Sequence, residues 1–200
     1  MARSSVVTWA ALALLAPSAA FAQVGPHDVA FGKLAYQSSN YVGSFVANRA
    51  VDGNTDGNIV IGSTTHTNAD FQAWWYVDLG ANYNISSITL WNRTDAGGNR
   101  LGNFYLSVLA SGTPNVDAIG APTVWQTFNE GSIGTSNAYT LPSGVVGQYV
   151  KVQFDHADYL SLAEVDVEGT AETTAPEPGS LVLLATGLAG MVVRRTRRRA

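Results

Sequence analysis

The central part of the chain consists of short runs in which apolar and polar residues alternate, and this pattern most limits its possible folds. Val150, Val152 and Phe154, for example, are separated by single polar residues. A period of two places successive side chains on opposite faces of a strand, with one face buried. Further runs, separated by Gly, Asn and Pro, are 75–79, 85–92, 105–109, 124–128, 138–141 and 162–169. The pattern predicts several short antiparallel strands in a β-sandwich or barrel.

Length and composition agree with one such domain flanked by short segments. The chain has 200 residues, of which 13% are charged, and five Trp, eight Tyr and seven Phe supply a sizeable aromatic core. It contains no cysteine, so the domain depends on its core and not on disulfides.

The formal net charge of −4 conceals a more acidic centre. Six of the eleven basic residues lie in the terminal segments, and residues 23–170 hold five Lys and Arg against thirteen Asp and Glu, a net charge of −8. A domain this acidic does not attract polyanions. Binding to nucleic acid or to an anionic membrane by charge alone is therefore excluded.

The first 22 residues have the features of a secretory signal peptide. Arg3 supplies a positive charge, residues 6–15 form an apolar run, and Ala20-Phe21-Ala22 is a small-x-small cleavage site. The alternative is a membrane-spanning helix, but the run is short and Pro17 interrupts it. The sequence predicts export, with residues 1–22 removed.

The C-terminal end contains three consecutive elements. Residues 171–178 read as a polar linker ending in Pro176-Glu177-Pro178, an apolar helix is expected within 181–193, and residues 194–199 are rich in arginine. Together, the motif and the segment 179–200 resemble the PEP-CTERM sorting signal of Gram-negative bacteria. The resemblance implies transient residence in the inner membrane, recognition by an exosortase, removal of the tail and delivery to the envelope surface or exterior. A tail that is kept as a membrane anchor is the alternative.

A series of short segments runs through the domain in a fixed order. They are Val29-Ala30, Gly32-Lys33, Ala35, Gln37-Ser38-Ser39, then 50–54, 74–80 and 163–167. The series resembles the discoidin or coagulation-factor type C superfamily, and more narrowly the F-type lectins (fucolectins). The resemblance covers essentially residues 28–170. It implies that residues 23–170 form an all-β, antiparallel jelly-roll β-sandwich of eight main strands, with ligand loops clustered at one end.

Four residues in this domain have the chemistry of a sugar site. Arg93, Asp95 and Arg100 lie within eight residues, and His66 lies 27 residues before Arg93. A guanidinium only donates hydrogen bonds, and a carboxylate that accepts from it fixes its orientation. Two such donors and an imidazole suit a neutral ligand rich in hydroxyl groups. Taken separately, the Arg–Asp pair is an ordinary surface ion pair and His66 a loop residue.

The spacing of these residues matches the sugar-binding motif of the F-type lectins. The resemblance implies that His66, Arg93 and Arg100 contact L-fucose and that Asp95 orients the arginines. Many fucolectins carry two consecutive cysteines between the arginines, and their disulfide packs against the fucose methyl group, whereas this chain has Ala96-Gly97. We therefore predict fucose or a related sugar, with Ile59, Val60 and Ile61 as replacement contacts for the methyl group.

The segment 52–58 superficially resembles a calcium loop, but it lacks the acidic twelfth residue and the flanking helices of an EF-hand. The family resemblance implies a structural calcium ion that joins the last strand to the ligand loops. An Asp-Gly-Asn sequence also favours a tight turn without any metal, which is the alternative. The residues at the matching positions are Arg49, Asp52, Asn54, Ser63, Ala163 and Glu164.

These observations predict an exported carbohydrate-binding protein that is not an enzyme. A single sugar site usually binds weakly, so a homo-oligomer or dense surface display would add avidity. One alternative is a structural envelope or matrix protein with the same fold and no sugar affinity. Another is a glycoside hydrolase, but nothing places two carboxylates at the required separation. Trp74-Trp75 could form a sugar-stacking platform, although their position in a strand favours core packing.

Overall fold

The computed structural model describes residues 27–113, 115–118 and 120–172. The predicted signal peptide (1–22) and the sorting tail (179–200) lie outside these residues, as does the linker beyond residue 172. Within the described ranges, no helix has the length and apolar character needed to cross a membrane.

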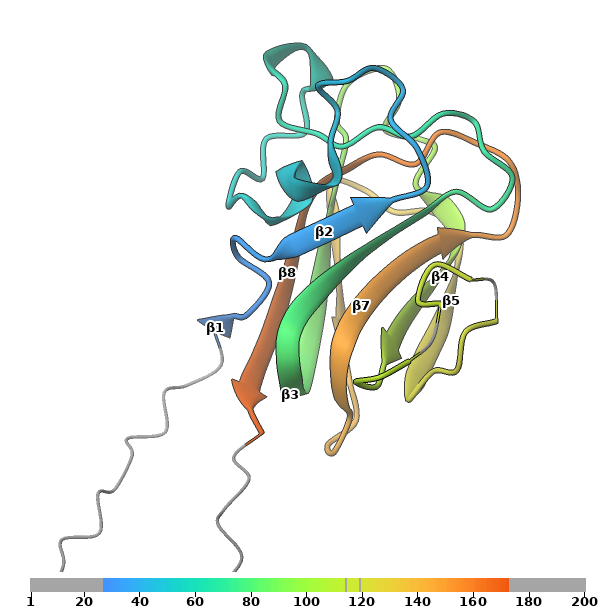
Figure 1. The fold of residues 1–200 in the computed structure, drawn as a ribbon. Coiled ribbons are helices and arrows are strands. Elements are labelled where there is room, and N and C mark those ends of the chain that lie inside the picture. The colour runs from blue at the N-terminus through green and yellow to red at the C-terminus, as the bar shows by residue number, and fades with distance from the viewer. Residues whose placement is uncertain (1–26, 114, 119, 173–200) are drawn as a thin grey trace, which may run out of the picture.

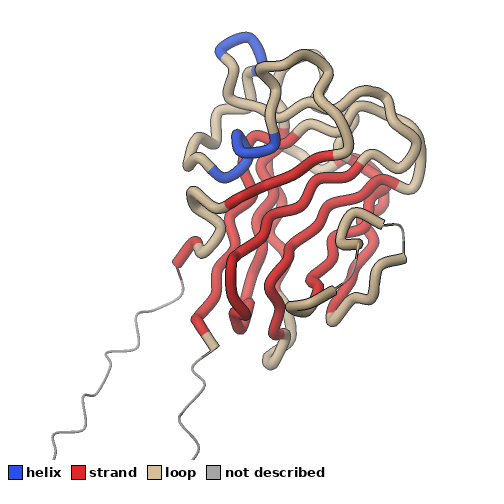
Figure 2. Tube along the Cα trace, viewed as in Figure 1, coloured by secondary structure: helices blue, strands red, loops and turns tan. Residues whose placement is uncertain are grey.

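The described chain is an antiparallel all-β domain, as predicted (Figures 1 and 2). The hydrogen-bonded strand order is β1-β8-β3-β7-β4-β5, and β2 and β6 both pair with β3. The strands are β1 (His27–Asp28), β2 (Leu34–Gln37), β3 (Trp74–Asn92), β4 (Gly102–Leu109), β5 (Trp125–Ser132), β6 (Ser136–Thr140), β7 (Val146–Phe154) and β8 (Leu162–Ala171). Two 3₁₀ helices, η1 (Ala47–Val51) and η2 (Ile59–Ile61), lie in the β2–β3 connection.

Strand β3 joins two of the runs that the sequence separates. It has 19 residues, and Gly80, with φ of 82°, lies at its bend. The register against β7 shifts between Asp78 and Tyr83, and beyond the bend β3 pairs with β8 and β6. Figure 1 shows the bend at the bottom of the domain, so that both ends of β3 lie at the top. This path places the residues that follow Asn92 beside the β2–β3 connection.

The core follows the predicted alternation. Val150, Val152 and Phe154 are fully buried, as is Trp75, whose Nε1 donates to the carbonyl oxygen of Ala47 at 2.9 Å. Burying a side chain as large as Trp75 is a major stabilising contribution, and its polar end is satisfied by η1. Other core residues are Val77, Ile88, Leu90, Phe104, Leu106, Leu162 and Val165.

The two tryptophans predicted to share the core lie on opposite faces of β3. Trp75 is buried, whereas Trp74 is half-buried on the outer face, where its ring stacks on Tyr76 with 5.5 Å between centroids. Adjacent residues of a strand point to opposite faces, so only one of them can enter the core. The core prediction is therefore right for Trp75 and wrong for Trp74.

The long connections gather at one end of the sandwich. Figures 1 and 2 show the β2–β3 connection, with both 3₁₀ helices, at the top together with the β3–β4 and β7–β8 loops. The two ends of the described chain lie at the opposite end, where His27 pairs with Gly169. A rigid sheet that presents loops from distant parts of the sequence at one end is a common platform for binding sites.

Candidate functional site

His66 is held in a buried, extended segment that runs beside the start of β8. The backbone N–H of Thr65 donates to Leu162 O at 2.8 Å, and the N–H of Leu162 donates back to Thr65 Oγ1 at 2.9 Å. Thr67 and Leu160 make the same reciprocal pair at 3.0 and 2.9 Å. Because His66 lies between these two hydrogen-bonded pairs, its backbone is fixed on both sides.

The imidazole of His66 has a defined tautomer. Its Nδ1 lies 2.7 Å from Thr67 O, and a carbonyl oxygen can only accept, so Nδ1 carries the proton. In the neutral ring Nε2 is therefore a hydrogen-bond acceptor. Aromatic rings surround the imidazole, with centroids of Tyr41 at 4.8 Å, Tyr159 at 5.3 Å and Phe45 at 5.8 Å, and His66 is only 5% exposed.

Arg93 and Asp95 form a braced pair directly after β3. Arg93 Nε donates to Asp95 Oδ1, while Asp95 Oδ2 accepts from the backbone N–H of Ile59 at 3.1 Å. Burial raises the pKa of Asp95, but the hydrogen bond and charge of Arg93 and the backbone N–H groups of Ile59 and Gly97 outweigh it, so the pKa lies below its usual value. The carboxylate therefore stays ionised and connects the first arginine to η2.

Gly97 provides the space in which the Arg93 guanidinium lies. A Cβ atom at this position would come within 2.9 Å of Arg93 Cζ and Nη1 and 3.0 Å of Nε. The guanidinium is the flexible end of its side chain, so a Cβ would displace it without disturbing the fold.

We expect Gly97→Ala to lower sugar affinity by about 10-fold, because one misplaced charged hydrogen bond costs roughly 1.5 kcal/mol. The melting temperature should change little. Calorimetric titration with a fucoside measures the affinity, and Gly43→Ala, where nothing lies within 4 Å of the added carbon, is the control. Equal affinities for both variants and the wild type would contradict this placement of Arg93.

Arg100 approaches the same region from the end of the β3–β4 loop. Its guanidinium carbon lies 5.0 Å from the centroid of the Tyr159 ring, within the range of a cation–π contact. Its Nε is 3.9 Å from Asp158 Oδ1, and the side chain is 37% exposed. Arg100 is thus oriented by the β7–β8 loop, and part of its side chain is exposed.

The structure brings all four predicted sugar-site residues together. Burial lowers the pKa of His66, the positive charges of Arg93 and Arg100 lower it further, and the charge of Asp95 and the bond to Thr67 O act in the opposite direction. The geometry agrees, because the Tyr159 ring contacts both His66 and Arg100, and Arg93 is bonded to Asp95. The site therefore offers the donors of two guanidinium groups and one imidazole acceptor, a set that matches a ligand with several hydroxyl groups.

We expect acid to weaken sugar binding, because a protonated Nε2 of His66 can no longer accept. The affinity should be constant above about pH 6.5 and fall below the lowered pKa, by up to about tenfold per pH unit. Since the unfolded chain binds this proton more readily, the stability contributed by neutral His66 is complete above about pH 6.5 and is lost as the pH falls through the folded-state pKa. Titrations at several pH values test this. His66→Gln should give a flat profile, and affinity that rises on acidification would contradict the tautomer.

Glu164 is the centre of the predicted metal site. It is fully buried on β8, and its carboxylate accepts from the backbone N–H groups of Gly53 at 3.1 Å and Asp52 at 3.3 Å. Burial raises its pKa to about 7, and the negative charges of Asp52 and Asp166 contribute to the increase. In the part of the chain that the structure describes, no basic side chain forms an ion pair with Glu164. A buried carboxylate without a basic partner is suited to bind a cation.

The remaining predicted metal ligands lie in the 52–58 loop or close to it. Ala163 precedes Glu164 and is fully buried, and Ser63 Oγ donates to the carbonyl oxygens of Asp56 and Asn58. Asn54 lies within the loop, where its N–H donates to Asp52 Oδ1 at 2.9 Å and its Oδ1 accepts from Asp56 N–H at 3.1 Å. Arg49 lies on η1 and its Nη1 donates to Thr64 O at 3.4 Å. The structure thus places Asp52 directly beside Glu164, and Asn54 and Ser63 in the same loop system.

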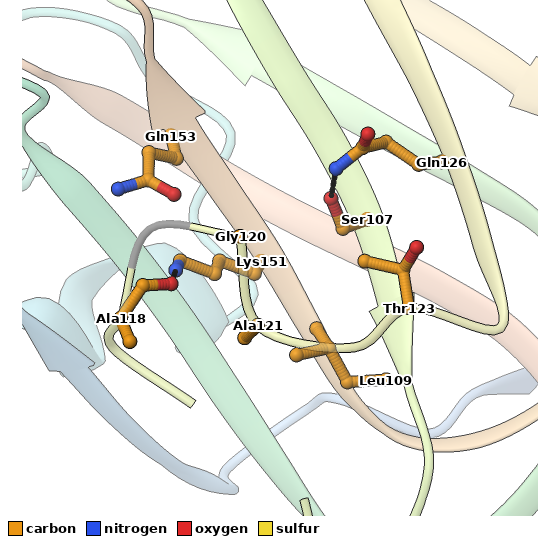
Figure 3. A pocket seen from close by; sticks show the side chains of 9 residues that line it. All are labelled: Ser107, Leu109, Ala118, Gly120, Ala121, Thr123, Gln126, Lys151 and Gln153. Atoms are coloured by element: carbon orange, nitrogen blue, oxygen red, sulfur yellow. Dashed lines mark hydrogen bonds between the residues drawn. The ribbon is translucent and has the colours of Figure 1, made fainter. Parts of the chain in front are cut away.

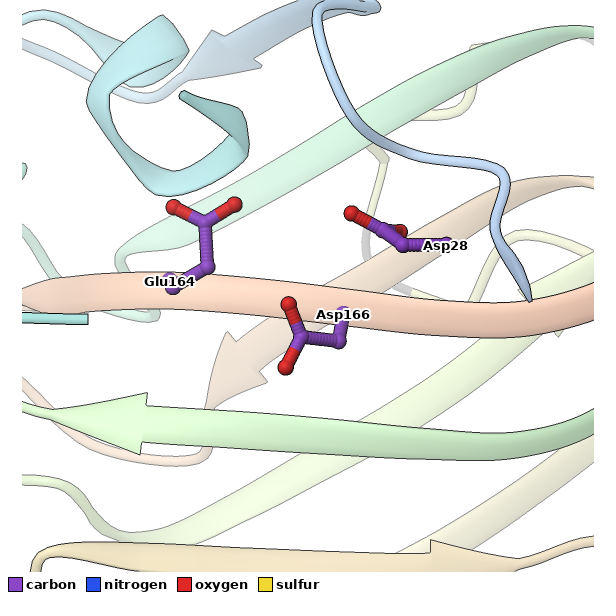
Figure 4. Close-up of side chains that lie close together, drawn as sticks. All are labelled: Asp28, Glu164 and Asp166. Atoms are coloured by element: carbon purple, nitrogen blue, oxygen red, sulfur yellow. The ribbon is translucent and has the colours of Figure 1, made fainter. Parts of the chain in front are cut away.

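A second group of carboxylates shares Glu164. Oxygen atoms of Asp28, Glu164 and Asp166 lie within 4.8 Å of one another (Figure 4). Asp28 Oδ1 already accepts from the N–H groups of Ala30 and Val167, and Asp166 Oδ2 accepts from Trp91 Nε1 at 2.7 Å. All three carboxylates therefore already accept hydrogen bonds from the protein, Glu164 from the N–H groups of Asp52 and Gly53 on its loop side.

A small cavity on the outer face of the sheet contains a buried lysine (Figure 3). Lys151 is 3% exposed, its Nζ donates to Ala118 O at 2.8 Å, and burial lowers its pKa to about 8. The cavity volume is about 20 Å³, enough for one or two water molecules and too small for a sugar ring. This lysine fastens the β4–β5 connection to β7.

The sequence did not reveal the aromatic rings that line the predicted sugar site. Tyr41 and Tyr159 come from the β2–β3 and β7–β8 connections, and their rings contact His66 and, for Tyr159, Arg100. Asp158, from the β7–β8 connection, lies beside Arg100. Neither periodicity nor motif spacing marks these residues, because their role depends on which loops meet at the end of the sandwich.

Known proteins share both the fold and the sequence. Residues 49–152 match the NedA-like, galactose-binding domain of the F5/F8 type C group, and residues 174–199 match the PEP-CTERM protein-sorting motif. Fucolectin-3 of Anguilla japonica is 35% identical over 144 residues, which are 70% of this chain and 78% of the relative.

Two solved structures extend the comparison. A fucose binding module of Streptococcus pneumoniae is 33% identical, with a TM-score of 0.63 over 74% of this chain and 96% of the module. A fucolectin from striped bass (Morone saxatilis) serum is 30% identical, with a TM-score of 0.67 over 76% of this chain and 52% of that protein. The chain belongs to the fucolectin family of galactose-binding-like β-sandwich domains.

Proposed function

We propose that this protein is an exported lectin that binds fucose or a closely related sugar, and that His66, Arg93 and Arg100 contact the ligand while Asp95 orients Arg93. The single observation that carries the proposal is the convergence of these four residues at the loop end of the sandwich. Membership of the fucolectin family supports fucose as the starting candidate. The function is recognition without covalent chemistry.

The geometry provides the two kinds of contact that a deoxy sugar needs. The polar side meets the guanidinium groups of Arg93 and Arg100 and the imidazole acceptor of His66. The apolar side is supplied by exposed residues on η2, where Val60 is 86% and Ile61 63% exposed. Because Ile59 N–H donates to Asp95, η2 is attached to the sugar site. We propose these side chains as the apolar contact for the fucose methyl group, in place of the paired cysteines of other fucolectins.

A calcium ion bound by Glu164 and the 52–58 loop would stabilise this arrangement. Asp52, Asn54 and Ser63, with main-chain oxygens of Arg49 and Ala163, provide the oxygen ligands that calcium prefers. The buried carboxylate of Glu164 and its neighbour Asp52 favour a cation. The ion would supply positive charge and join β8 to the loop that leads to η2.

The PEP-CTERM motif supports sorting through an exosortase, with delivery to the envelope surface or the exterior in a Gram-negative bacterium. The N-terminal signal, the cleaved tail and the lectin domain of residues 23–170 then act in sequence: export, processing and glycan binding. A homo-oligomer would raise the avidity of a weak single site.

A glycan array probed with the purified domain, residues 23–172, tests the proposed function. We expect signals from glycans with terminal fucose or a related sugar, and these signals should disappear in Arg93→Ala and Arg100→Ala. An array without any bound glycan would favour the structural envelope protein considered above. Turnover of glycosides that a single Asp or Glu substitution abolishes would instead establish a hydrolase.

A further inference from the structure

The small cavity beside Lys151 brings together three buried polar side chains on the outer face of the sheet (Figure 3). Ser107 on β4 and Lys151 on β7 are direct partners in the strand register, so their side chains leave the same face of the sheet. Gln153, two residues further along β7, lies on that face as well. Their exposed fractions are only 4%, 3% and 8%. The strands thus form a polar cavity floor, over which the β4–β5 connection closes at Ala118.

Lys151 is a buried cation without a paired negative charge. Its ammonium group has three N–H donors, of which one donates to Ala118 O at 2.8 Å. Among the described residues it forms no ion pair, and the carboxylate whose charge acts on it, that of Asp117, is exposed to solvent. Burial lowers the pKa of Lys151 to about 8, so the group still holds its proton at neutral pH. A buried charge without an opposite charge is strongly unfavourable, and a bound anion would offset it.

Further hydrogen-bond donors lie around the same cavity. Ser107 Oγ accepts from Gln126 Nε2 at 2.9 Å, which leaves the Ser107 hydroxyl proton available to donate. The side-chain amide of Gln153 and the hydroxyl of Thr123 also line the cavity. Its volume of about 20 Å³ admits one water molecule or one ion of similar size, and a polar cavity of this kind is normally filled. Phosphate, sulfate and carboxylic acids are too large for it.

We propose that this cavity binds a small monovalent anion, a halide such as chloride, between the ammonium group of Lys151 and the hydroxyl of Ser107. The anion neutralises the buried lysine and links β4 and β7 to the connection that covers them. A water molecule in the same place accepts the hydrogen bonds but leaves the charge uncompensated. This site is independent of the proposed sugar binding, and neither depends on the other.

Bromide is a suitable probe because it resembles chloride and scatters X-rays anomalously. Crystals of the domain, residues 23–172, soaked in sodium bromide locate the ion directly. Melting curves recorded while sodium bromide replaces sodium gluconate at constant ionic strength measure its effect on stability. Lys151→Met removes the charge and keeps an unbranched side chain, and Lys33→Met removes a charge from a half-buried position that does not line the cavity.

We expect an anomalous peak beside Lys151 Nζ. The melting temperature of the wild type should rise by about 3–6 °C when bromide reaches roughly ten times its dissociation constant. Lys33→Met should show the same rise and Lys151→Met none. A cavity that holds only water in the bromide-soaked crystal overturns the proposal, and this crystal decides even if Lys151→Met does not fold. A bromide effect of equal size in folded Lys151→Met overturns it as well, because the ion then binds elsewhere.

Discussion

Replacing Arg93 with alanine is expected to reduce affinity for a fucoside by about 100-fold, because a guanidinium that makes charged hydrogen bonds contributes roughly 1.5–3 kcal/mol. Arg93 is only 12% exposed and is braced by Asp95, so its donors are already oriented before the ligand arrives. The same substitution leaves Asp95 without its guanidinium, and the melting temperature should fall by only a few degrees, since Asp95 keeps the backbone N–H of Ile59.

Two further variants separate orientation from charge. Arg93→Lys retains the positive charge but loses the planar fork that Asp95 holds, and it should bind nearly as poorly as Arg93→Ala. Lys33→Ala removes a positive charge from a residue that is not part of the site, and its affinity should equal that of the wild type. Titration calorimetry provides the three dissociation constants. Full affinity in Arg93→Lys would show that net charge, and not the oriented fork, determines binding.

The largest loss of stability is expected for Glu164→Ala. Glu164 is buried and accepts from the N–H groups of Asp52 and Gly53, so its removal leaves a cavity in a fully buried position and two backbone donors without their acceptor. We expect the free energy of unfolding to fall by about 2–4 kcal/mol and the melting temperature by roughly 10 °C. Differential scanning calorimetry measures both. Glu168→Ala, an exposed position on the same strand, is the control and should unfold within about 0.5 kcal/mol of the wild type.

Glu164→Gln distinguishes the hydrogen bonds from the proposed cation. Glutamine keeps a carbonyl acceptor but lacks the charge, so in chelator this variant should be at least as stable as the wild type, whose buried carboxylate has no basic partner among the described residues. Added calcium should raise the melting temperature of the wild type and leave that of Glu164→Gln unchanged. A wild-type melting curve that is identical in chelator and in calcium would contradict the proposed calcium site.

Much of the fold could be predicted from the period of two in the sequence. Runs such as 150–154 and 162–169 form β7 and β8, and their apolar positions are buried. The continuity of β3 could not be predicted, because Gly80 and the residues after it have the composition of a turn. In the structure the chain bends at this point and keeps its hydrogen bonds by exchanging one set of partners for another.

The candidate site was predictable where its residues are close in sequence or match a family spacing. Arg93, Asp95 and Arg100 share one loop, and family resemblance added His66. The contacts of Tyr41 and Tyr159 with His66 could not be predicted, because these residues come from connections that only the sandwich topology brings together. The same is true of Asp158 beside Arg100.

Glu164 and Asp52 are 112 residues apart in the sequence, and only the family resemblance indicated that they lie together. No local pattern predicts that the start of the last strand lies under the 52–58 loop. The hydrogen bonds by which Asn92 joins the β3–β4 loop to the β5–β6 turn were not predicted either, since Asn92 has no distinguishing feature in the sequence. The role of its side-chain amide depends on two carbonyl partners, Gly98 O and Gly134 O, and the second of these is 42 residues away in the sequence.

The side-chain NMR spectrum of the ¹⁵N-labelled domain, recorded during titration with methyl α-L-fucoside, tests most directly whether His66, Arg93 and Arg100 bind the sugar. We expect the Nε–H signals of Arg93 and Arg100 and the imidazole signals of His66 to shift together and to saturate with one dissociation constant. The Nε–H signal of Arg49, which lies on η1, should stay in place. If saturating fucoside leaves the Arg93, Arg100 and His66 signals unchanged, these residues do not form the sugar site.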